Sequence, residues 1–209
     1  MLRISLGGMG QFLIATASWV ALMRVVAMFG SPAIAAYTIA LRVMEFIFLP
    51  AWGLGNAAAT LVGQNLGAGQ VDRAERSAWL AAKFNTIFMT TAGVLILAFA
   101  HSITGWFSSE AEVIEVGTAC LRILAIGFPL YAVGMFMVQA MNGAGDTETP
   151  MALNFVCFWI IQIPLAYMLA TRTPMEANGV FVAEVLAESL LTVLAVIVFR
   201  RGKWKLHEA

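Results

Sequence analysis

The chain has 209 residues, of which 61% are hydrophobic and 11% charged, with a mean hydropathy of +0.85 and a formal net charge of zero. Soluble domains average about 45–50% apolar and about 25% charged residues, so this composition excludes an ordinary soluble fold, and it excludes a disordered chain as well. The balanced charge excludes the basic surface that nucleic-acid binding requires. The composition therefore predicts a protein whose solvent is a lipid bilayer.

Long apolar segments occupy most of the chain. A helix that crosses the hydrocarbon core needs about 20 apolar residues. The runs are continuously apolar rather than alternating, which favours helices over barrel strands. The sequence thus predicts an all-α membrane protein, with residues 1–209 forming a single transmembrane domain. The predicted spans are 6–29, 33–63, 79–101, 117–141, 151–171 and 179–199, followed by a tail at 200–209.

Prolines mark several places along these spans. Pro32 suits the first turn of the second span, because its missing N–H has no partner there in any case. Pro50, Pro129 and Pro164 lie inside spans, where proline removes a helix hydrogen bond and can kink the helix. Each of these three is interpreted either as a hinge or as a passive kink.

Lys and Arg residues are distributed unevenly between the two sides, which sets the orientation of a membrane protein. With the N-terminus inside, only three of them, Arg24, Arg122 and Arg172, lie at external ends of spans. Both termini are therefore predicted to be cytoplasmic, with the basic tail resting on anionic headgroups. The tryptophans at 79, 106 and 204 are expected near the membrane interfaces. The predicted cytoplasmic residues are Arg3, Arg73, Arg76, Lys83, Arg200, Arg201, Lys203 and Lys205.

Two carboxylates lie inside the last span, where ionisable groups are costly and often functional. Glu188 is nine residues into the predicted span, near the bilayer midplane, and Glu184 lies one turn outward on the same helix face. Such a pair can hold a proton in one state and bind a cation in another. The alternative is that both carboxylates have only a structural role in a wet cleft.

Other polar residues within the spans have two interpretations each. Arg42 and Glu45 are neighbours on one helix face, so an ion pair is favoured over a contact with substrate. Five amides, namely Gln11, Gln64, Gln139, Asn154 and Gln162, serve either to join helices or to line a substrate cavity. The many Met and Phe residues suit promiscuous binding of organic cations, although in such an apolar bundle they also face lipid or core.

The remaining reactive residues predict no other chemistry. Cys120 and Cys157 are expected at depths too different for a disulfide and are interpreted as small core residues. His101 is expected at an external helix end, as an interface residue. No metal cluster, phosphate loop or catalytic triad occurs at usable spacing, so the chain is not expected to be an enzyme or to bind a metal or other cofactor.

Two cytoplasmic turns resemble each other in composition. The second span ends in Gly63-Gln64-Asn65-Leu66-Gly67-Ala68-Gly69, and the fourth in Asn142-Gly143-Ala144-Gly145-Asp146-Thr147. Glycines there permit positive φ angles and tight helix ends. Asp146 and Thr147 can cap the next helix, with Pro150 in its first turn.

These turns carry a resemblance to a known family. Together with Gly53-Leu54-Gly55-Asn56, Phe128-Pro129, Pro164-Leu165 and the basic tail, they resemble the C-terminal half of a multidrug and toxic compound extrusion (MATE) transporter. The resemblance extends over essentially the whole chain. It implies one six-helix lobe of a two-lobed, twelve-helix exporter, with a cavity between the lobes that opens to alternate sides.

The resemblance also implies a function. Such transporters export organic cations and other drugs in exchange for protons or sodium, and the coupling ion here is expected to be H⁺ or Na⁺. The location implied is the bacterial inner membrane, and the missing lobe is expected as a separate chain, a missing N-terminal half or a second copy. Some sodium-coupled members carry two acids in this lobe; those positions fall at Thr16 and Tyr131, neither acidic, so that sodium site is not transferred. The candidate residues of the cation or substrate pathway are Glu188, Glu184, Glu45, Arg42, Gln139 and Tyr131.

Three alternatives remain beside the exporter. A related flippase for lipid-linked oligosaccharides shares the lobe design but favours cationic residues in its cavity, whereas the central charges here are mainly Glu45, Glu184 and Glu188. A truncated lobe with no transport of its own is the second alternative. An intramembrane enzyme is the third, and it lacks a convergent set of catalytic groups.

Overall fold

The computed structural model describes residues 2–206 and the side chains of residues 6–205. Helices joined by short turns make up this part of the chain, with no strand among the described residues. Six helical segments are long and apolar enough to cross a membrane, at Leu6–Phe29, Ser31–Gly67, Val71–Phe107, Ala111–Gly143, Glu148–Arg172 and Ala177–Arg200. The predicted all-α class is confirmed. The side chain of Arg3 and residues 207–209 of the predicted tail lie outside the described part.

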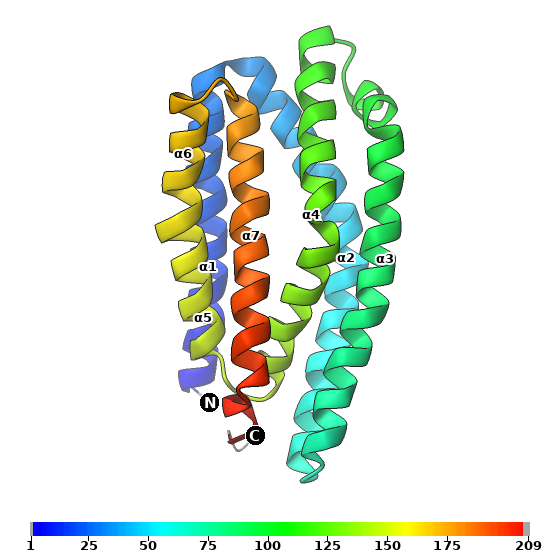
Figure 1. The fold of residues 1–209 in the computed structure, drawn as a ribbon, viewed down its shortest axis with the longest axis vertical. Helices are drawn as coiled ribbons and strands as arrows, with labels where there is room; N and C mark the ends of the chain where they lie inside the picture. The colour runs from blue at the N-terminus through cyan, green and yellow to red at the C-terminus, as the bar shows by residue number, and fades with distance from the viewer. Residues whose placement is uncertain (1, 207–209) are drawn as a thin grey trace.

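The helices alternate in direction, so that consecutive turns lie at opposite ends of the molecule. The first half comprises α1 (Leu2–Val26) with the short 3₁₀ turn η1 (Ala27–Phe29), α2 (Ser31–Gly67) and α3 (Val71–Phe107). The second half comprises α4 (Ala111–Gly143), α5 (Glu148–Asn154), the π-helix η2 (Phe155–Gln162), α6 (Ile163–Arg172), α7 (Ala177–Arg200) and the 3₁₀ turn η3 (Lys203–Leu206). The two chain ends and the turns after α2 and α4 share one end of the molecule (Figure 1).

Several helices extend beyond the ranges predicted from hydropathy. Predicted residues 79–101 lie within a helix that begins at Val71 and ends at Phe107. At about 1.5 Å per residue, a helix of 37 residues exceeds the hydrocarbon thickness of about 30 Å. Hydropathy marks only the part in lipid, whereas the charged residues from Asp72 to Arg76 continue the helix into the headgroups and water.

The prolines occupy different helical environments. Pro32 lies in the first turn of α2, as predicted, and Pro50 and Pro129 lie inside α2 and α4. Pro164 instead follows the π-helix η2 and begins α6. Its ring would clash with the carbonyl one α-turn earlier, and we attribute the wider turn before it to this constraint. The sequence predicted a kink at Pro164 but not a π-helix.

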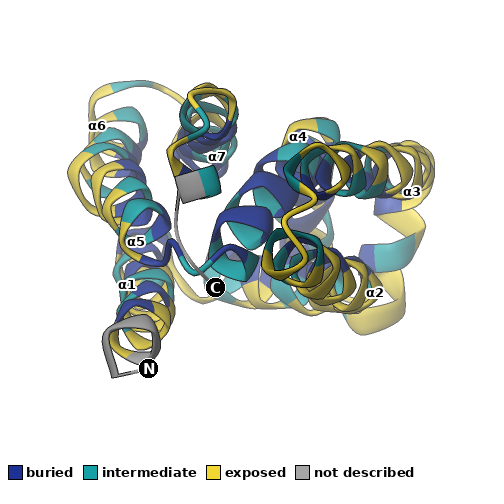
Figure 2. Cartoon of the chain, turned by 90° about the horizontal axis from the view of Figure 1, so that it is seen from below, coloured by how far each residue is buried: buried dark blue, intermediate teal, exposed yellow. Residues whose placement is uncertain are grey.

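The fold consists of two groups of helices around a central helix. α1, α5, α6 and α7 form one side, α2 and α3 form the other, and α4 packs against α2, α3 and α7 (Figures 1 and 2). Buried residues concentrate on α4, while exposed side chains cover the outer faces of α1, α2 and α3 (Figure 2). A bundle with apolar side chains outside is the arrangement expected of a protein surrounded by lipid.

Candidate functional site: a carboxylate-containing cavity

A cavity of about 420 Å³ lies between α1, α2, α4, η2 and α7. Most of its wall is apolar and rich in aromatic and Met side chains. Two carboxyl groups of α7 and a row of amides are the main polar features of the lining. The aromatic and Met residues that line it are Phe12, Trp19, Met44, Phe48, Trp52, Met89, Met135 and Phe158.

Glu184 and Glu188 both line this cavity, one turn apart on α7. Glu184 is buried, and its Oε2 accepts a hydrogen bond of 3.1 Å from the Tyr37 hydroxyl on α2. Tyr37 is itself fully buried and stacks on Phe181 at 5.6 Å between ring centroids. Glu188 is half-buried at the cavity wall. The pair is therefore asymmetric, because the Tyr37 hydroxyl holds one carboxyl in place.

Tyr131 of α4 is a second tyrosine near this pair. It lines the same cavity as both carboxyls and is 93% buried. Among the described residues its hydroxyl oxygen has no hydrogen-bond partner. A buried hydroxyl normally has one. Tyr131 thus brings a polar group without a protein partner close to two carboxyl groups.

A network of amides joins three helices on the side of the cavity nearer the chain ends. The Gln11 side-chain nitrogen donates to Asn142 Oδ1 and to the Thr147 carbonyl, each at 3.0 Å. Asn142 Nδ2 donates back to Gln11 Oε1 and to Gln139 Oε1. Gln139 Nε2 in turn donates to Asn56 Oδ1 at 3.0 Å. These bonds connect α1, α4 and α2.

The five predicted amides therefore have different roles. Gln11 and Gln139 both join helices and line the cavity, so the two interpretations apply together. Asn154 lines the cavity, and Gln162 is buried outside its lining. Gln64 is exposed at the end of α2.

Arg42 and Glu45 form the ion pair that the sequence favoured, with 3.0 Å between Arg42 Nη1 and Glu45 Oε2. Both side chains are largely exposed. Glu45 also lines the cavity, whereas Arg42 is not among its lining residues. The structure thus brings five of the predicted pathway residues, Glu45, Tyr131, Gln139, Glu184 and Glu188, to one cavity and leaves the sixth at its margin.

The glycine-containing turns lie at the end of the molecule that carries both termini. A Cβ atom on Gly63 would lie 2.8 Å from the carbonyl oxygen of Gly143, and one on Gly143 would lie 2.7 Å from Ala59 Cα. These glycines allow α2 and α4 to touch backbone to backbone. A Cβ atom on Gly67, the last residue of α2, would have no atom within 4 Å.

The predicted tight turns and helix cap are confirmed in part. Gly69 and Gly145 have positive φ angles, +70° and +86°. The Thr149 N–H donates to Asp146 Oδ1 at 3.2 Å, so Asp146 caps α5. The Thr147 side chain makes no capping bond, although its carbonyl accepts from Gln11.

The tryptophans expected near the membrane interfaces differ in exposure. Trp204 is 1% exposed and stacks on Phe199, with 4.6 Å between ring centroids. Its indole N–H donates to the Phe199 carbonyl, which satisfies its polar atom inside the protein. The tail therefore folds back at Gly202, where φ is +73°. Trp106, by contrast, is 80% exposed.

Sequence reasoning missed the role of Tyr37. Its partner Glu184 lies 147 residues away along the chain, so the neighbouring sequence does not indicate the contact. A tyrosine inside an apolar run was the available signal, because a buried hydroxyl needs a partner. Cys120 and Cys157 are both buried with free thiols.

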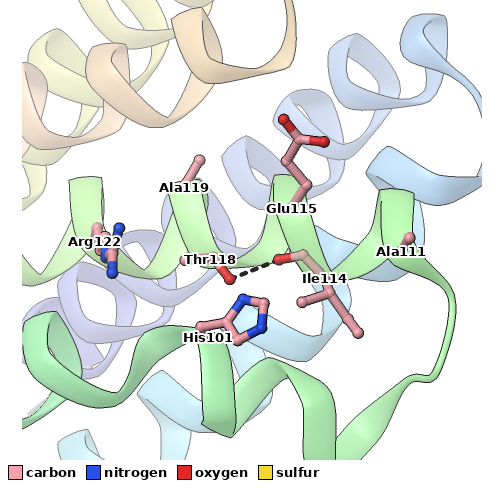
Figure 3. A pocket seen from close by; sticks show the side chains of 7 residues that line it. All are labelled: His101, Ala111, Ile114, Glu115, Thr118, Ala119 and Arg122. Carbon is pink, nitrogen blue, oxygen red and sulfur yellow. Dashed lines mark hydrogen bonds between the residues drawn. The ribbon is translucent and has the colours of Figure 1, made fainter.

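A second cavity of about 410 Å³ lies between the end of α3 and the beginning of α4. His101, Glu115 and Arg122 contribute to its lining, and the Thr118 hydroxyl donates to the Ile114 carbonyl at 2.6 Å (Figure 3). The Glu115 carboxyl points away from the His101 ring (Figure 3), so the ionisable groups do not converge. The described residues hold no group of three or more His, Cys, Asp or Glu side chains suited to a metal.

Known proteins match both the sequence and the fold. The MatE family model matches residues 9–168. A protein named "Probable multidrug resistance protein NorM" from Mannheimia succiniciproducens is 30% identical over 196 residues, covering 90% of this chain and 42% of that protein. Its namesake from Thermotoga maritima is 26% identical over 179 residues, covering 84% of this chain and 38% of that protein.

Solved structures match across the whole lobe. The structure described as "MATE transporter ClbM in complex with Rb+" superposes with a TM-score of 0.91 and 23% identity, covering all of this chain and 49% of that one. The chain thus spans about two fifths of the length of the curated relatives above and half of this solved transporter. Six membrane-length helices and these matches together define a multi-pass membrane protein. The chain belongs to the MATE family.

Proposed function

We propose that this chain forms one six-helix lobe of a multidrug exporter, and that its central cavity binds organic cations for transport rather than for catalysis. The observation that carries this proposal is the pair of carboxyl groups, Glu184 and Glu188, inside a cavity walled by aromatic and Met side chains. Aromatic faces attract cations, and flexible Met side chains adapt to ligands of different shapes. The multidrug names of the relatives agree with this assignment.

The charge of the cavity also favours a cation over a phosphate-bearing substrate. Its ionisable lining residues, within the described part of the chain, are Glu45, Glu184, Glu188 and Tyr131, with no Lys or Arg. A flippase for lipid-linked oligosaccharides would need cationic groups to bind phosphate. The guanidinium of Arg42 is near the cavity but pairs with Glu45.

A second lobe completes the binding site in this proposal. Three aromatic residues that line the cavity remain exposed in this lobe. Phe12 is 72% exposed, Trp52 is 42% exposed and Trp19 is 40% exposed. A ligand cavity normally buries most of the surface of a drug-sized molecule. This lobe alone would leave one side of such a molecule uncovered. The second lobe is a separate chain, an N-terminal half or another copy, and a lobe without one would not transport.

The coupling ion is H⁺ or Na⁺, and the carboxyl pair is the proposed site of exchange. Two carboxyls one turn apart repel each other when both are charged, so a proton or a cation is bound more readily than at an isolated acid. Export from the cytoplasm across a bacterial inner membrane, with both termini inside, fits the distribution of Lys and Arg.

Binding of tetraphenylphosphonium to the purified chain, assembled with a complementary six-helix lobe, tests the role of Glu188. The Glu188→Gln variant should bind this permanent cation at least tenfold more weakly, because a charge facing the ligand is lost. The matched control is Glu115→Gln, which removes a carboxyl from the outer end of α4 and should bind like the wild type. Equal binding by Glu188→Gln and wild type would overturn the proposed site.

Ethidium efflux from cells tests the need for a second lobe. Cells that express the chain with a complementary six-helix lobe should expel ethidium, and cells in which either part is present only as a monomer should not. Efflux by this chain alone, with a monomeric purified protein, would contradict the two-lobe proposal. Absence of efflux from every pairing that assembles would contradict the exporter assignment itself.

A further inference from the structure

The beginning of α3 and the end of α7 meet around one tryptophan at the end of the molecule that carries both termini (Figure 1). The Arg200 guanidinium lies 5.6 Å from the centroid of the Trp79 ring. Phe199 packs edge-on against the same ring at 6.0 Å. Residues separated by 121 positions are thereby joined into one surface.

Trp79 is surrounded by cationic groups. Arg76 and Lys83 lie three residues before it and four residues after it, and therefore on its face of α3. Arg76, Lys83 and Arg200 are all exposed. We call these three residues and Trp79 the basic cluster. A guanidinium over an indole ring retains its outward N–H groups, which suit the planar geometry of a phosphate.

Two acidic residues of α3, Glu75 and Asp72, lie near the basic cluster. Glu75 forms an ion pair with Lys205, whose ammonium also lies 5.6 Å from the Trp204 ring. That ion pair holds the tail against α3, and in it one acid and one cation neutralise each other. Asp72 lies in the first turn of α3, one turn before Arg76, and no ion pair joins these two among the described residues. The cluster thus has three cationic side chains on an exposed face, with Asp72 beside one of them.

An apolar stripe on α3 begins within the cluster and continues beyond it. Leu80, Phe84 and Ile87 are 53%, 60% and 56% exposed and follow one another at helical spacing from Arg76. The seven helical steps from Arg76 to Lys83 span about 10 Å along the axis, on the scale of a headgroup layer. The cationic side chains at headgroup depth match the phosphate of a phospholipid, and the apolar stripe matches its acyl chains.

We infer that the basic cluster is a binding site for one anionic phospholipid, with its phosphodiester held by Arg76, Lys83 and Arg200 and its acyl chains along Leu80, Phe84 and Ile87. In the tail, Trp204 is buried and Lys205 pairs with Glu75, and α3 supplies two of the three cations of this site. A lipid in this position would bridge the two helices and restrain their relative movement.

Native mass spectrometry of the detergent-purified chain tests this site. The probe is an equimolar mixture of phosphatidylglycerol and phosphatidylcholine with identical acyl chains. The wild type should retain phosphatidylglycerol preferentially. The triple variant Arg76→Gln/Lys83→Gln/Arg200→Gln should lose this preference by about tenfold or more, because each cation near an anionic headgroup contributes about fivefold.

Two control variants separate a specific site from general charge and from misfolding. Arg24→Gln/Arg122→Gln/Arg172→Gln removes the same charge from the opposite ends of the helices and should leave the preference intact. Arg76→Lys/Arg200→Lys keeps the charge and should retain at least half of it. Equal retention of the two lipids by the wild type, or equal losses in both triple variants, would overturn the inference.

A soluble competitor distinguishes a lipid from a free anion. Millimolar glycerol phosphate, which lacks acyl chains, should not displace phosphatidylglycerol. Full displacement would overturn the lipid assignment and show a site for small phosphates. Because the readout is lipid retention, it stays informative if the chain binds no tetraphenylphosphonium, so failure of the exporter proposal and failure of this inference are distinguishable.

Discussion

Helices α2 and α4 touch each other along much of their length, but they do so in two different ways. Near the chain ends they meet at Ala59, Gly63 and Gly143, which we call the glycine seam, where backbone touches backbone. Farther from the chain ends, Phe48 of α2 meets Phe128 and Tyr131 of α4 through rings 5.7 and 6.3 Å apart. The seam fixes the spacing of the helices, and the larger side chains keep open the cavity above it.

This difference predicts that substitutions in the seam and in the cavity fail differently. Without a hydrophobic driving force between helices in lipid, close packing of small residues is a main source of association. Seam variants should therefore lose stability. Cavity variants should mostly retain stability. A cavity variant should lose stability only where the substitution breaks a hydrogen bond.

The largest effect is expected at Gly143. Gly143→Ala places a methyl group against the backbone of Ala59, so we expect a loss of about 2–3 kcal/mol in unfolding free energy. Gly67→Ala is the matched control, because no atom lies within 4 Å of its added Cβ. Unfolding in a detergent titration measures both. A Gly143→Ala variant as stable as Gly67→Ala would show that the seam is not tightly packed.

An intermediate effect is expected at Tyr37. Tyr37→Phe removes the hydrogen bond to Glu184 and leaves a buried carboxyl without that donor, at a cost of about 1 kcal/mol. Tyr167→Phe, at an exposed position, controls for the loss of a hydroxyl and should be neutral. The same titration measures both variants, and equal stabilities would mean that the bond contributes nothing.

Substitution of Tyr131 should change stability in the opposite direction. Its hydroxyl is buried without a protein partner, so Tyr131→Phe should leave stability unchanged or raise it by up to about 1 kcal/mol. Thermal unfolding in detergent, followed by circular dichroism, is the measurement. A loss as large as that of Tyr37→Phe would show that the Tyr131 hydroxyl is hydrogen-bonded after all.

The smallest effect is expected at the exposed pair Arg42 and Glu45. Each single reversal, Arg42→Glu or Glu45→Arg, should cost about 0.5 kcal/mol or less, because exposed pairs contribute little. The double reversal should recover most of that loss and most of any loss in tetraphenylphosphonium binding. Additive losses in the double variant would count against the pairing.

The membrane fold could be read from the sequence because lipid imposes strict conditions. Each span needs a long apolar run, and the positions of the helices followed from those runs. The glycines at 69 and 145 and the cap at Asp146 were also predictable, since each depends on residues adjacent in the chain. The ion pair between Arg42 and Glu45 belongs to the same local class.

Contacts between distant segments were not predictable in this way. The sequence identified Glu184 and Glu188 as a carboxyl pair, but it could not supply the Tyr37 hydroxyl from the second helix. The return of Trp204 onto Phe199 likewise depends on tertiary packing that overrides the interfacial preference of Trp. The π-helix before Pro164 has no sequence signature beyond the proline itself.

The bonds of Gln11 have a consequence for the order in which the lobe assembles. Its side chain enters the membrane with α1, yet the partners that satisfy it, Asn142 and Thr147, are synthesised more than 130 residues later. An unsatisfied amide in hydrocarbon is unfavourable, so α1 has no settled place until the turn after α4 has arrived. Helix α1 is therefore fixed in place only after α4 and the turn that follows it have been made, and the interval between the synthesis of α1 and of this turn is the period in which α1 is most exposed to misassembly.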